Sequence, residues 1–194
     1  MMQKAVFILI GLIFMVQPAF ADNIAEVDRF MKERLDGIMR LLEDKTLQKT
    51  TRNEQIIDII SEAFDFTTMA KLSLGKKHWT RLNKEDKTRF TQLFVERLKA
   101  SYLEKLDLYD DEAIVYSKPV QVKNKVQMMT ALVSGGDKIT MLYKLYNSKK
   151  AGWRVYDLEL EGVSLITTYR SQFNEVLASG TMTDLFAKLE RPEK

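Results

Sequence analysis

Residues 139–166 read ITMLYKLYNSKKAGWRVYDLELEGVSLI, and the hydrophobic pattern changes twice within them. Residues 139–146 and 153–160 alternate in polarity and are enriched in β-branched and aromatic side chains, as strands are. The segment 147–152 falls between them, where a hairpin turn belongs. After Gly162 the apolar residues return at helical spacing. The stretch therefore predicts two antiparallel strands followed by a helix.

The pattern on either side of this stretch extends the prediction to a whole domain. Two more strands are expected over residues 113–116 and 120–133, giving an antiparallel sheet of about four strands whose last three form a meander. Helices occupy nearly all of the first half and the end of the chain, and their expected ranges are 22–42, 52–64, 65–75, 83–108, 163–180 and 183–189. This order is typical of an α+β domain in which helices pack on one face of a curved sheet.

The N-terminus has the features of an export signal. Lys4 supplies the positive charge, residues 5–16 are continuously apolar, and Ala19-Phe20-Ala21 provides the small residues of a cleavage site. We therefore expect residues 1–21 to be removed and residues 22–194 to form a single domain of net charge +2, since Lys4 is the only charge lost from the +3 of the whole chain. The alternative is a retained membrane helix, but twelve apolar residues fall short of the roughly 20 that span a bilayer.

The composition excludes several classes of protein. The chain has no cysteine and one histidine, His78, which removes cysteine-based and multi-histidine zinc sites, thiol nucleophiles and disulfides. The small net charge gives no strong field for holding DNA or RNA. Ser164 lacks the second glycine of the hydrolase motif G-x-S-x-G, and no phosphate-binding glycine loop occurs. We therefore expect no catalytic site, no metal site and no nucleic-acid partner.

Both faces of the last two long strands are expected to be apolar. A period of two places Trp153 and Val155 on one face and Leu158 and Leu160 on the other. Such a sheet fits a solid domain with helices on both sides, and it equally fits a sheet that lines a cavity for a hydrophobic ligand.

Among the charged residues, Arg170 allows the most specific prediction of a partner. It lies seven residues after Val163 and seven before Leu177, which places its stem on the apolar stripe of the last long helix. An unpaired guanidinium there would be costly, so a partner is required. Asp157 is the first candidate because it interrupts an apolar strand, and the alternative is that Arg170 reaches the rim of a cavity and meets an anionic head group.

The segment Gly152-Trp-Arg-Val-Tyr-Asp-Leu-Glu-Leu-Glu-Gly-Val-Ser-Leu-Ile166, continued by Thr168-Tyr-Arg-Ser-Gln-Phe173, resembles the MlaC family of periplasmic phospholipid-binding proteins, also called the toluene-tolerance family. Upstream, Phe64-Asp65-Phe66, Leu74-Gly75 and Trp79 fit the same family in order and spacing. The resemblance covers most of the chain, from about Val27 to Leu189.

This resemblance implies a monomeric carrier, not an enzyme, that holds a phospholipid in an apolar cavity between helices and a strongly curved sheet. The phospholipid is bound cargo, and no cofactor is implied. The implied partners are an outer-membrane lipoprotein associated with a porin and an inner-membrane ABC transporter complex that contains an MCE-domain protein. Lipid exchange between them would maintain the lipid asymmetry of the outer membrane.

Side chains that line such a cavity need to be apolar and adaptable. The candidates are Ile60, Phe94, Met128, Met141, Leu142, Leu145, Val163 and Ile166. Besides the carrier, one other interpretation stays open, which is a periplasmic accessory protein that binds a partner protein through an apolar groove and carries no lipid.

Overall fold

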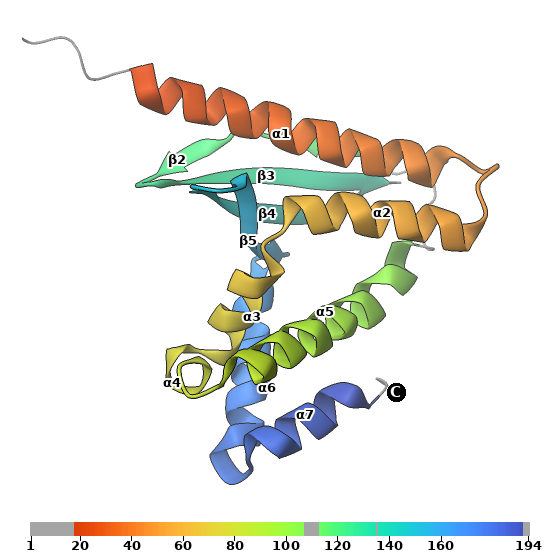
Figure 1. The fold of residues 1–194 in the computed structure, drawn as a ribbon. Helices are drawn as coiled ribbons and strands as arrows, with labels where there is room; N and C mark the ends of the chain where they lie inside the picture. Colours follow the sequence, from red (N-terminus) through yellow and green to blue (C-terminus); the bar gives the residue numbers. More distant parts are fainter. Residues whose placement is uncertain (1–17, 107–112, 135, 192–194) are drawn as a thin grey trace, which may run out of the picture.

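The computed structural model describes residues 18–106, 113–134 and 136–191, and within them the chain is an α+β domain, as predicted (Figure 1). Seven helices and six strands lie in these ranges. The helices are α1 (Pro18–Glu43), α2 (Lys49–Ala63), α3 (Phe66–Leu74), α4 (Lys76–Trp79), α5 (Lys84–Leu106), α6 (Leu165–Ser179) and α7 (Met182–Glu190). The strands are β1 (Ala113–Tyr116), β2 (Val120–Val122), β3 (Lys125–Ser134), β4 (Asp137–Ser148), β5 (Gly152–Leu160) and β6 (Val163–Ser164).

The expected helices are present, and the short α4 adds one that the pattern did not predict. Asp65 caps α3 by accepting a hydrogen bond from the Thr68 backbone N–H at 2.8 Å, and Ser164 caps α6 in the same way. Residues 1–17, most of the expected export signal, lie outside the described residues, so cleavage before Asp22 stays a prediction. No helix in the described ranges is long and apolar enough to cross a membrane.

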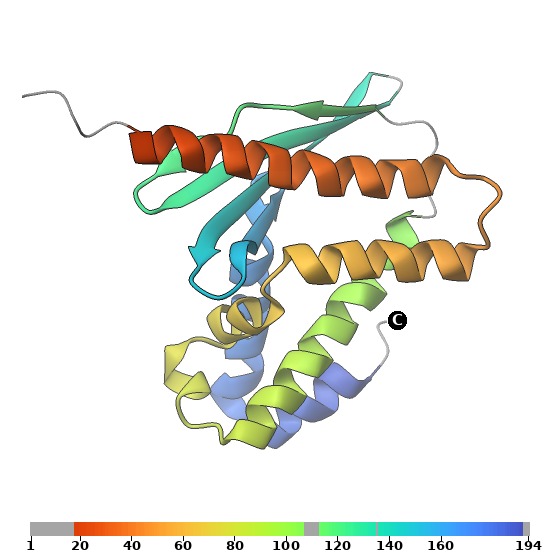
Figure 2. The same ribbon diagram turned by 45° about the horizontal axis from the view of Figure 1, so that its top comes forward.

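The strands form one antiparallel sheet in the order β1-β3-β4-β5-β6, with β2 also paired to β3, and the predicted meander of β3, β4 and β5 is confirmed. The predicted strand 120–133 divides at the turn Lys123-Asn124, where Lys123 has a φ of 58°. The short β6 pairs with the end of β5. The sheet is not strongly curled (Figure 2), so the expected strong curvature is wrong, and the described part of the chain shows no enclosed apolar cavity.

A β-bulge in β5 decides which side chains share a face of the sheet. Lys144 pairs with Asp157 while the next residue, Leu145, pairs with Val155, so Tyr156 is the extra residue. The expectation that Leu158 and Leu160 lie opposite Val155 is therefore wrong, because the bulge reverses the alternation after Tyr156. We call the face that carries Val155, Leu158 and Leu160 the inner face, and the face that carries Asp157 the outer face.

Among the described residues, the buried apolar side chains form two separate clusters. The first, the sheet core, lies between α1 and the inner face, where Val27 and Met31 pack against strand residues. The second, the helical core, lies among α3, α5, α6 and α7 and is centred on Phe90, Phe94 and Phe173, whose rings lie 5.4–6.4 Å apart. Figures 1 and 2 show the corresponding arrangement, with α1 lying along the sheet and α3 to α7 forming a separate layer below.

Candidate functional site

Large apolar side chains that are only partly buried lie where the two cores meet. Phe64 and Leu158 pack against both cores, which no other apolar residue in the described ranges does. Met141 and Tyr116 adjoin the sheet core, while Leu160 and Tyr102 adjoin the helical core. We call these six residues the seam: Phe64, Tyr102, Tyr116, Met141, Leu158 and Leu160.

The sheet side of the seam is a row of cross-strand neighbours. Tyr116 lies opposite Thr130, Thr130 opposite Met141, and Met141 opposite Leu160. Cross-strand pairs bring side chains to within van der Waals reach, so these residues form one continuous strip on the inner face. Tyr116 and Met141 in the strip pack against the sheet core, and Leu160 packs against the helical core, so the strip runs from one core to the other. These three side chains are partly buried, while Thr130 between them is buried.

One end of the strip is tied to α1 by a polar contact. The Tyr116 hydroxyl donates a hydrogen bond to the Asp36 carboxylate, and the Lys32 ammonium lies 5.8 Å from the centre of the Tyr116 ring. Burial, together with the Asp36 carboxylate, raises the pKa of Tyr116 above its ordinary value. The phenol is therefore neutral at physiological pH and orients an otherwise apolar ring.

An open cleft of about 390 Å³ adjoins the seam at Phe64. Phe64 and Phe66 stack in its wall with ring centres 5.9 Å apart, and Arg154 supplies a positive charge. Phe64 belongs to both the cleft and the seam, while Tyr146 and Arg154 of the cleft lie on the outer face. We call this the Arg154 cleft, and its lining residues are Phe64, Asp65, Phe66, Thr67, Tyr146, Ser148, Ala151 and Arg154.

Asp65 organises the wall of the Arg154 cleft. Its backbone N–H donates to the Val155 carbonyl at 2.8 Å, and its carboxylate accepts hydrogen bonds from Thr68 and from the Tyr146 hydroxyl. Burial by itself would raise the pKa of Asp65, but these hydrogen bonds and the charge of Arg154 hold it below its usual value. The ionised carboxylate therefore fixes the start of α3 against the sheet.

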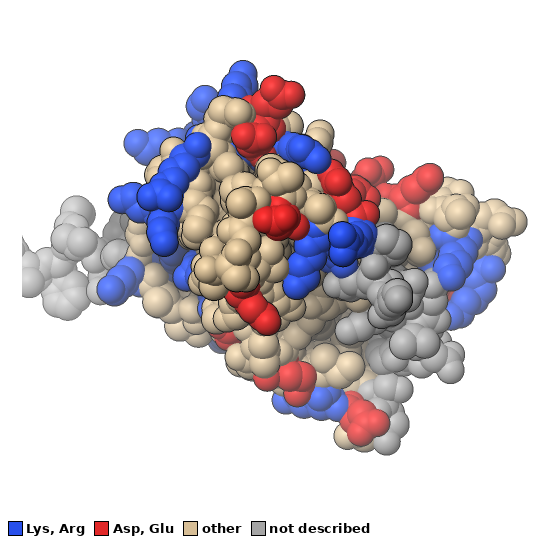
Figure 3. All heavy atoms as spheres, turned by 90° about the horizontal axis from the view of Figure 1, so that it is seen from below, with Lys and Arg blue, Asp and Glu red and all other residues tan. Residues whose placement is uncertain are grey.

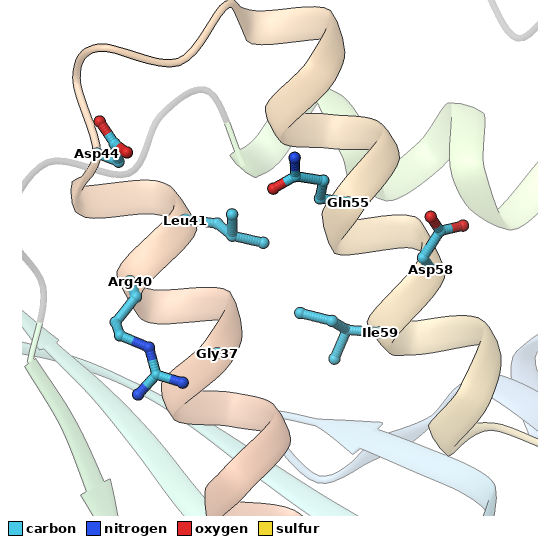
Figure 4. A pocket seen from close by; sticks show the side chains of 7 residues that line it. All are labelled: Gly37, Arg40, Leu41, Asp44, Gln55, Asp58 and Ile59. Carbon is cyan, nitrogen blue, oxygen red and sulfur yellow. The ribbon is translucent and has the colours of Figure 1, made fainter.

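A second cleft, of about 450 Å³, lies between α1 and α2 (Figure 4). Leu41 and Ile59 extend into the gap between the helices, while Arg40, Asp44 and Asp58 lie around its margin. It is open and carries charges of both signs, so it suits acyl chains poorly. None of the eight candidate lipid-binding residues lines either cleft.

The eight candidates do not share one surface. Met128 and Leu145 are fully buried in the sheet core and Phe94 in the helical core. Ile166 is also buried, and Ile60 is half-buried on α2. Leu142 lies on the outer face beside Glu159, and Val163, in β6, is 59% exposed. Among the eight, only Met141 belongs to the seam.

Arg170 does not pair with Asp157, so that prediction is wrong. Its Nε and Nη2 donate to the Leu72 carbonyl at 2.9 and 2.6 Å, near the C-terminus of α3, where a positive charge is favourable. Val163 belongs to a strand, not to the helix, so the spacing that placed Arg170 on an apolar stripe does not apply. The buried stripe of α6 consists of Leu165, Ile166, Tyr169 and Phe173.

Arg170→Ala is expected to lower the free energy of unfolding by about 1 kcal/mol, because the Leu72 carbonyl loses two charge-assisted donors at an exposed position. Urea unfolding measures the loss, and Arg170→Lys should recover part of it. An unchanged midpoint in Arg170→Ala would show that water replaces the guanidinium without cost.

Asp157 has Lys144 as its cationic partner. Its side chain is 6% exposed and lies 3.1 Å from the Lys144 ammonium, which also contacts Glu159. Asp157 further accepts hydrogen bonds from the Ser164 hydroxyl at 2.9 and 3.0 Å and from the Ile166 backbone N–H at 3.3 Å. The carboxylate therefore holds the N-terminus of α6 against the outer face. No group of three or more histidine, aspartate or glutamate side chains in the described ranges could hold a metal ion.

Comparison with known proteins places the chain in a family. The sequence model of the MlaC protein matches residues 32–191. A solved structure with the same fold is that of a phospholipid-binding protein from Ralstonia solanacearum in complex with a phospholipid; it has a TM-score of 0.71 and 20% sequence identity, covering 87% of this chain and 94% of that one. A search of curated proteins finds no match. The family match spans most of the chain and includes every element from the middle of α1 to the end of α7, and the chain belongs to the MlaC family.

Proposed function

We propose that this protein binds a phospholipid with its acyl chains in the seam between the two cores. The observation that carries the proposal is the partly buried apolar strip on the inner face, which lies between two cores that are each packed independently. Family membership and the shared fold of the solved phospholipid complex support it.

The two-core interior offers a way to take up lipid without a preformed cavity. Among the apolar residues described, only Phe64 and Leu158 pack against both cores, so the layers can separate at the seam with each core intact. Separation would expose the strip of Tyr116, Met141 and Leu160, and acyl chains entering between the layers would cover it again. Uptake then exchanges protein–protein contacts for protein–lipid contacts of similar polarity.

The gain from covering the tails is large. Each methylene moved out of water contributes about 0.8 kcal/mol, so two long tails represent on the order of 20 kcal/mol. Part of this gain is needed to separate the layers. Arg154 lies in the cleft that adjoins the seam at Phe64, where its guanidinium would meet the phosphate of the head group.

We further propose that residues 1–21 direct export and that the processed chain shuttles phospholipid through the periplasm. The donor and acceptor would be an outer-membrane lipoprotein associated with a porin and an inner-membrane ABC transporter complex with an MCE-domain protein. Such exchange would maintain the lipid asymmetry of the outer membrane. A passive binder of this kind equilibrates lipid between its partners, and the direction of net flow comes from the transporter.

The proposal predicts that the full precursor, expressed in a Gram-negative host, yields a periplasmic protein that begins at Asp22 and carries phospholipid. Mass spectrometry of the intact protein gives the N-terminus, and organic extraction followed by mass spectrometry identifies the lipid. A chain that contains no lipid and takes up none from vesicles would instead favour the accessory protein that binds a partner through an apolar groove.

A further inference from the structure

The charges of the chain are unevenly distributed, and the segment from β1 to the start of β5 is strongly basic. Residues 113–154, from β1 to the start of β5, contain eight lysines or arginines and a single acidic residue, Asp137. Because the whole chain has a net charge of only +3, the remaining residues carry a net charge of −4. The small net charge therefore conceals a basic segment, and the rest of β5 carries the acidic residues Asp157 and Glu159.

Much of this basic charge lies at one end of the sheet. The β2–β3 turn carries Lys123, the β4–β5 turn carries Lys149 and Lys150, and the pairing of Lys125 with Tyr146 brings the two turns to the same end. Asp137 lies at the opposite end, in the β3–β4 turn. Figure 3 shows basic side chains along the left side of the molecule as seen from below, the side on which both β2 and α4 lie in Figure 1.

These lysines are available to an external partner. Lys118, Lys123, Lys149 and Lys150 are exposed, and none forms an ion pair with a residue that the structure describes. Two acidic side chains near this end of the sheet have hydrogen-bond partners of their own. Asp65 accepts hydrogen bonds from Tyr146 and Thr68, and Glu26 accepts one from the Trp153 indole at 3.0 Å. We call the four lysines, together with Val120 and Val122 of β2, the basic end.

Exposed apolar side chains accompany the lysines. Val120 is 59% exposed and Val122 is 40% exposed, and both lie on the short strand β2 beside Lys118 and Lys123. Small apolar groups surrounded by lysines fit the boundary between head groups and acyl chains of a bilayer, where the cations meet phosphates and the apolar groups enter the interface. A flat acidic protein surface would use the charges but would gain little from the protruding valines.

We propose that the basic end docks on the surface of a bilayer rich in anionic phospholipid. The Arg154 cleft is lined by Ser148 and Ala151, which flank Lys149 and Lys150, so docking in this orientation places the cleft against the head groups. The proposal rests on the proposed function, because docking would serve the exchange of a lipid between the bilayer and the seam. The electrostatic attraction to the bilayer depends only on the positions of the lysines in the basic end.

Flotation with vesicles tests the docking. The exported protein should bind phosphatidylglycerol vesicles at low salt, should be released at high salt because exposed charges are screened, and should not bind neutral phosphatidylcholine vesicles. The double variant Lys149→Gln, Lys150→Gln should bind about 30-fold more weakly, since each lysine near an anionic surface contributes about fivefold.

The matched control is the double variant Lys76→Gln, Lys77→Gln in α4. It removes two adjacent exposed lysines from the helical layer and should leave vesicle affinity unchanged. Val120→Asn should weaken binding at low salt, because it removes an apolar group from the interface while leaving every charge in place. Equal losses in the two lysine variants, or no binding of the unaltered protein to phosphatidylglycerol vesicles, would overturn the proposal, and the second result would point to an acidic protein partner.

The experiments distinguish a failure of the docking proposal from a failure of the lipid-carrier proposal. Both lysine variants should retain co-purified phospholipid, because the substitutions lie outside the seam. A protein that carries lipid but never floats with anionic vesicles contradicts the docking alone. A protein that floats as expected but never contains lipid contradicts the proposed function and leaves the docking supported.

Discussion

Met141→Glu is expected to abolish co-purification of phospholipid while the chain stays folded. Met141 lies on the inner face within the seam and is only partly buried, so the folded protein can hydrate a carboxylate there when the seam is empty. Acyl chains in the seam would remove that water. Burial of the charge against hydrocarbon costs at least about 3 kcal/mol, which weakens lipid binding more than 100-fold.

The control is the same substitution on the opposite face of the neighbouring strand. Met129 lies on the outer face of β3, opposite Leu142, and is 44% exposed, so Met129→Glu should bind lipid as the unaltered protein does. Extracted phospholipid per protein is the measurement, and circular dichroism confirms that both variants fold. Equal lipid content in the two variants would remove the seam as the site of the acyl chains.

Asp157→Ala is expected to lower the free energy of unfolding by about 3 kcal/mol. The change leaves the partly buried Lys144 with one carboxylate in place of two and removes the acceptor of the Ser164 hydroxyl and the Ile166 backbone N–H. The N-terminus of α6 thereby loses the negative charge that stabilises it. The shift in urea midpoint at a constant slope measures the loss.

Glu159→Gln provides the comparison, because it removes the other carboxylate at Lys144 and leaves the Asp157 contacts intact. Its side chain is more exposed than that of Asp157, so the expected loss is below about 1.5 kcal/mol. If both variants lost the same stability, the contacts of Asp157 to α6 would contribute nothing beyond its pairing with Lys144.

The helices and strands were predictable because local patterns determine them. Apolar residues at spacings of three and four define α1, α2, α5 and α6, and alternation with β-branched and aromatic residues defines β4 and β5. Resemblance of the segment from Gly152 to Phe173 to the MlaC family was confirmed by the match over residues 32–191. These features require no knowledge of which residues meet in space.

The composition of the seam was not predictable, because it depends on one extra residue. The bulge at Tyr156 places Leu158 and Leu160 on the same face as Val155, and nothing in the alternation of residues 153–160 marks it. The same shift brings Asp157 beside Lys144, which the assignment of Arg170 as its partner did not foresee. Because apolar residues continue on both sides of the bulge, the sequence of the strand has the pattern of an uninterrupted strand.

The division of the interior into two cores could not be predicted from the sequence either. Phe94, Met128 and Leu145 have the composition of cavity-lining residues, yet each is fully buried within one core. Apolar residues in a core and apolar residues along a seam differ only in how tightly they are packed. Neither residue type nor spacing in the sequence predicts that packing. The signal that distinguishes Phe64 and Leu158 is contact with both cores, and contact requires the fold.

Intermolecular nuclear Overhauser effects from protonated acyl chains to selectively labelled methyl groups test the seam most directly. With the phospholipid bound, the methyl groups of Met141, Leu158 and Leu160 should show contacts to the acyl chain, and that of Met129 on the outer face should show none. Contacts to Met129 with none to the three seam methyl groups would place the lipid on the other side of the sheet and contradict the account.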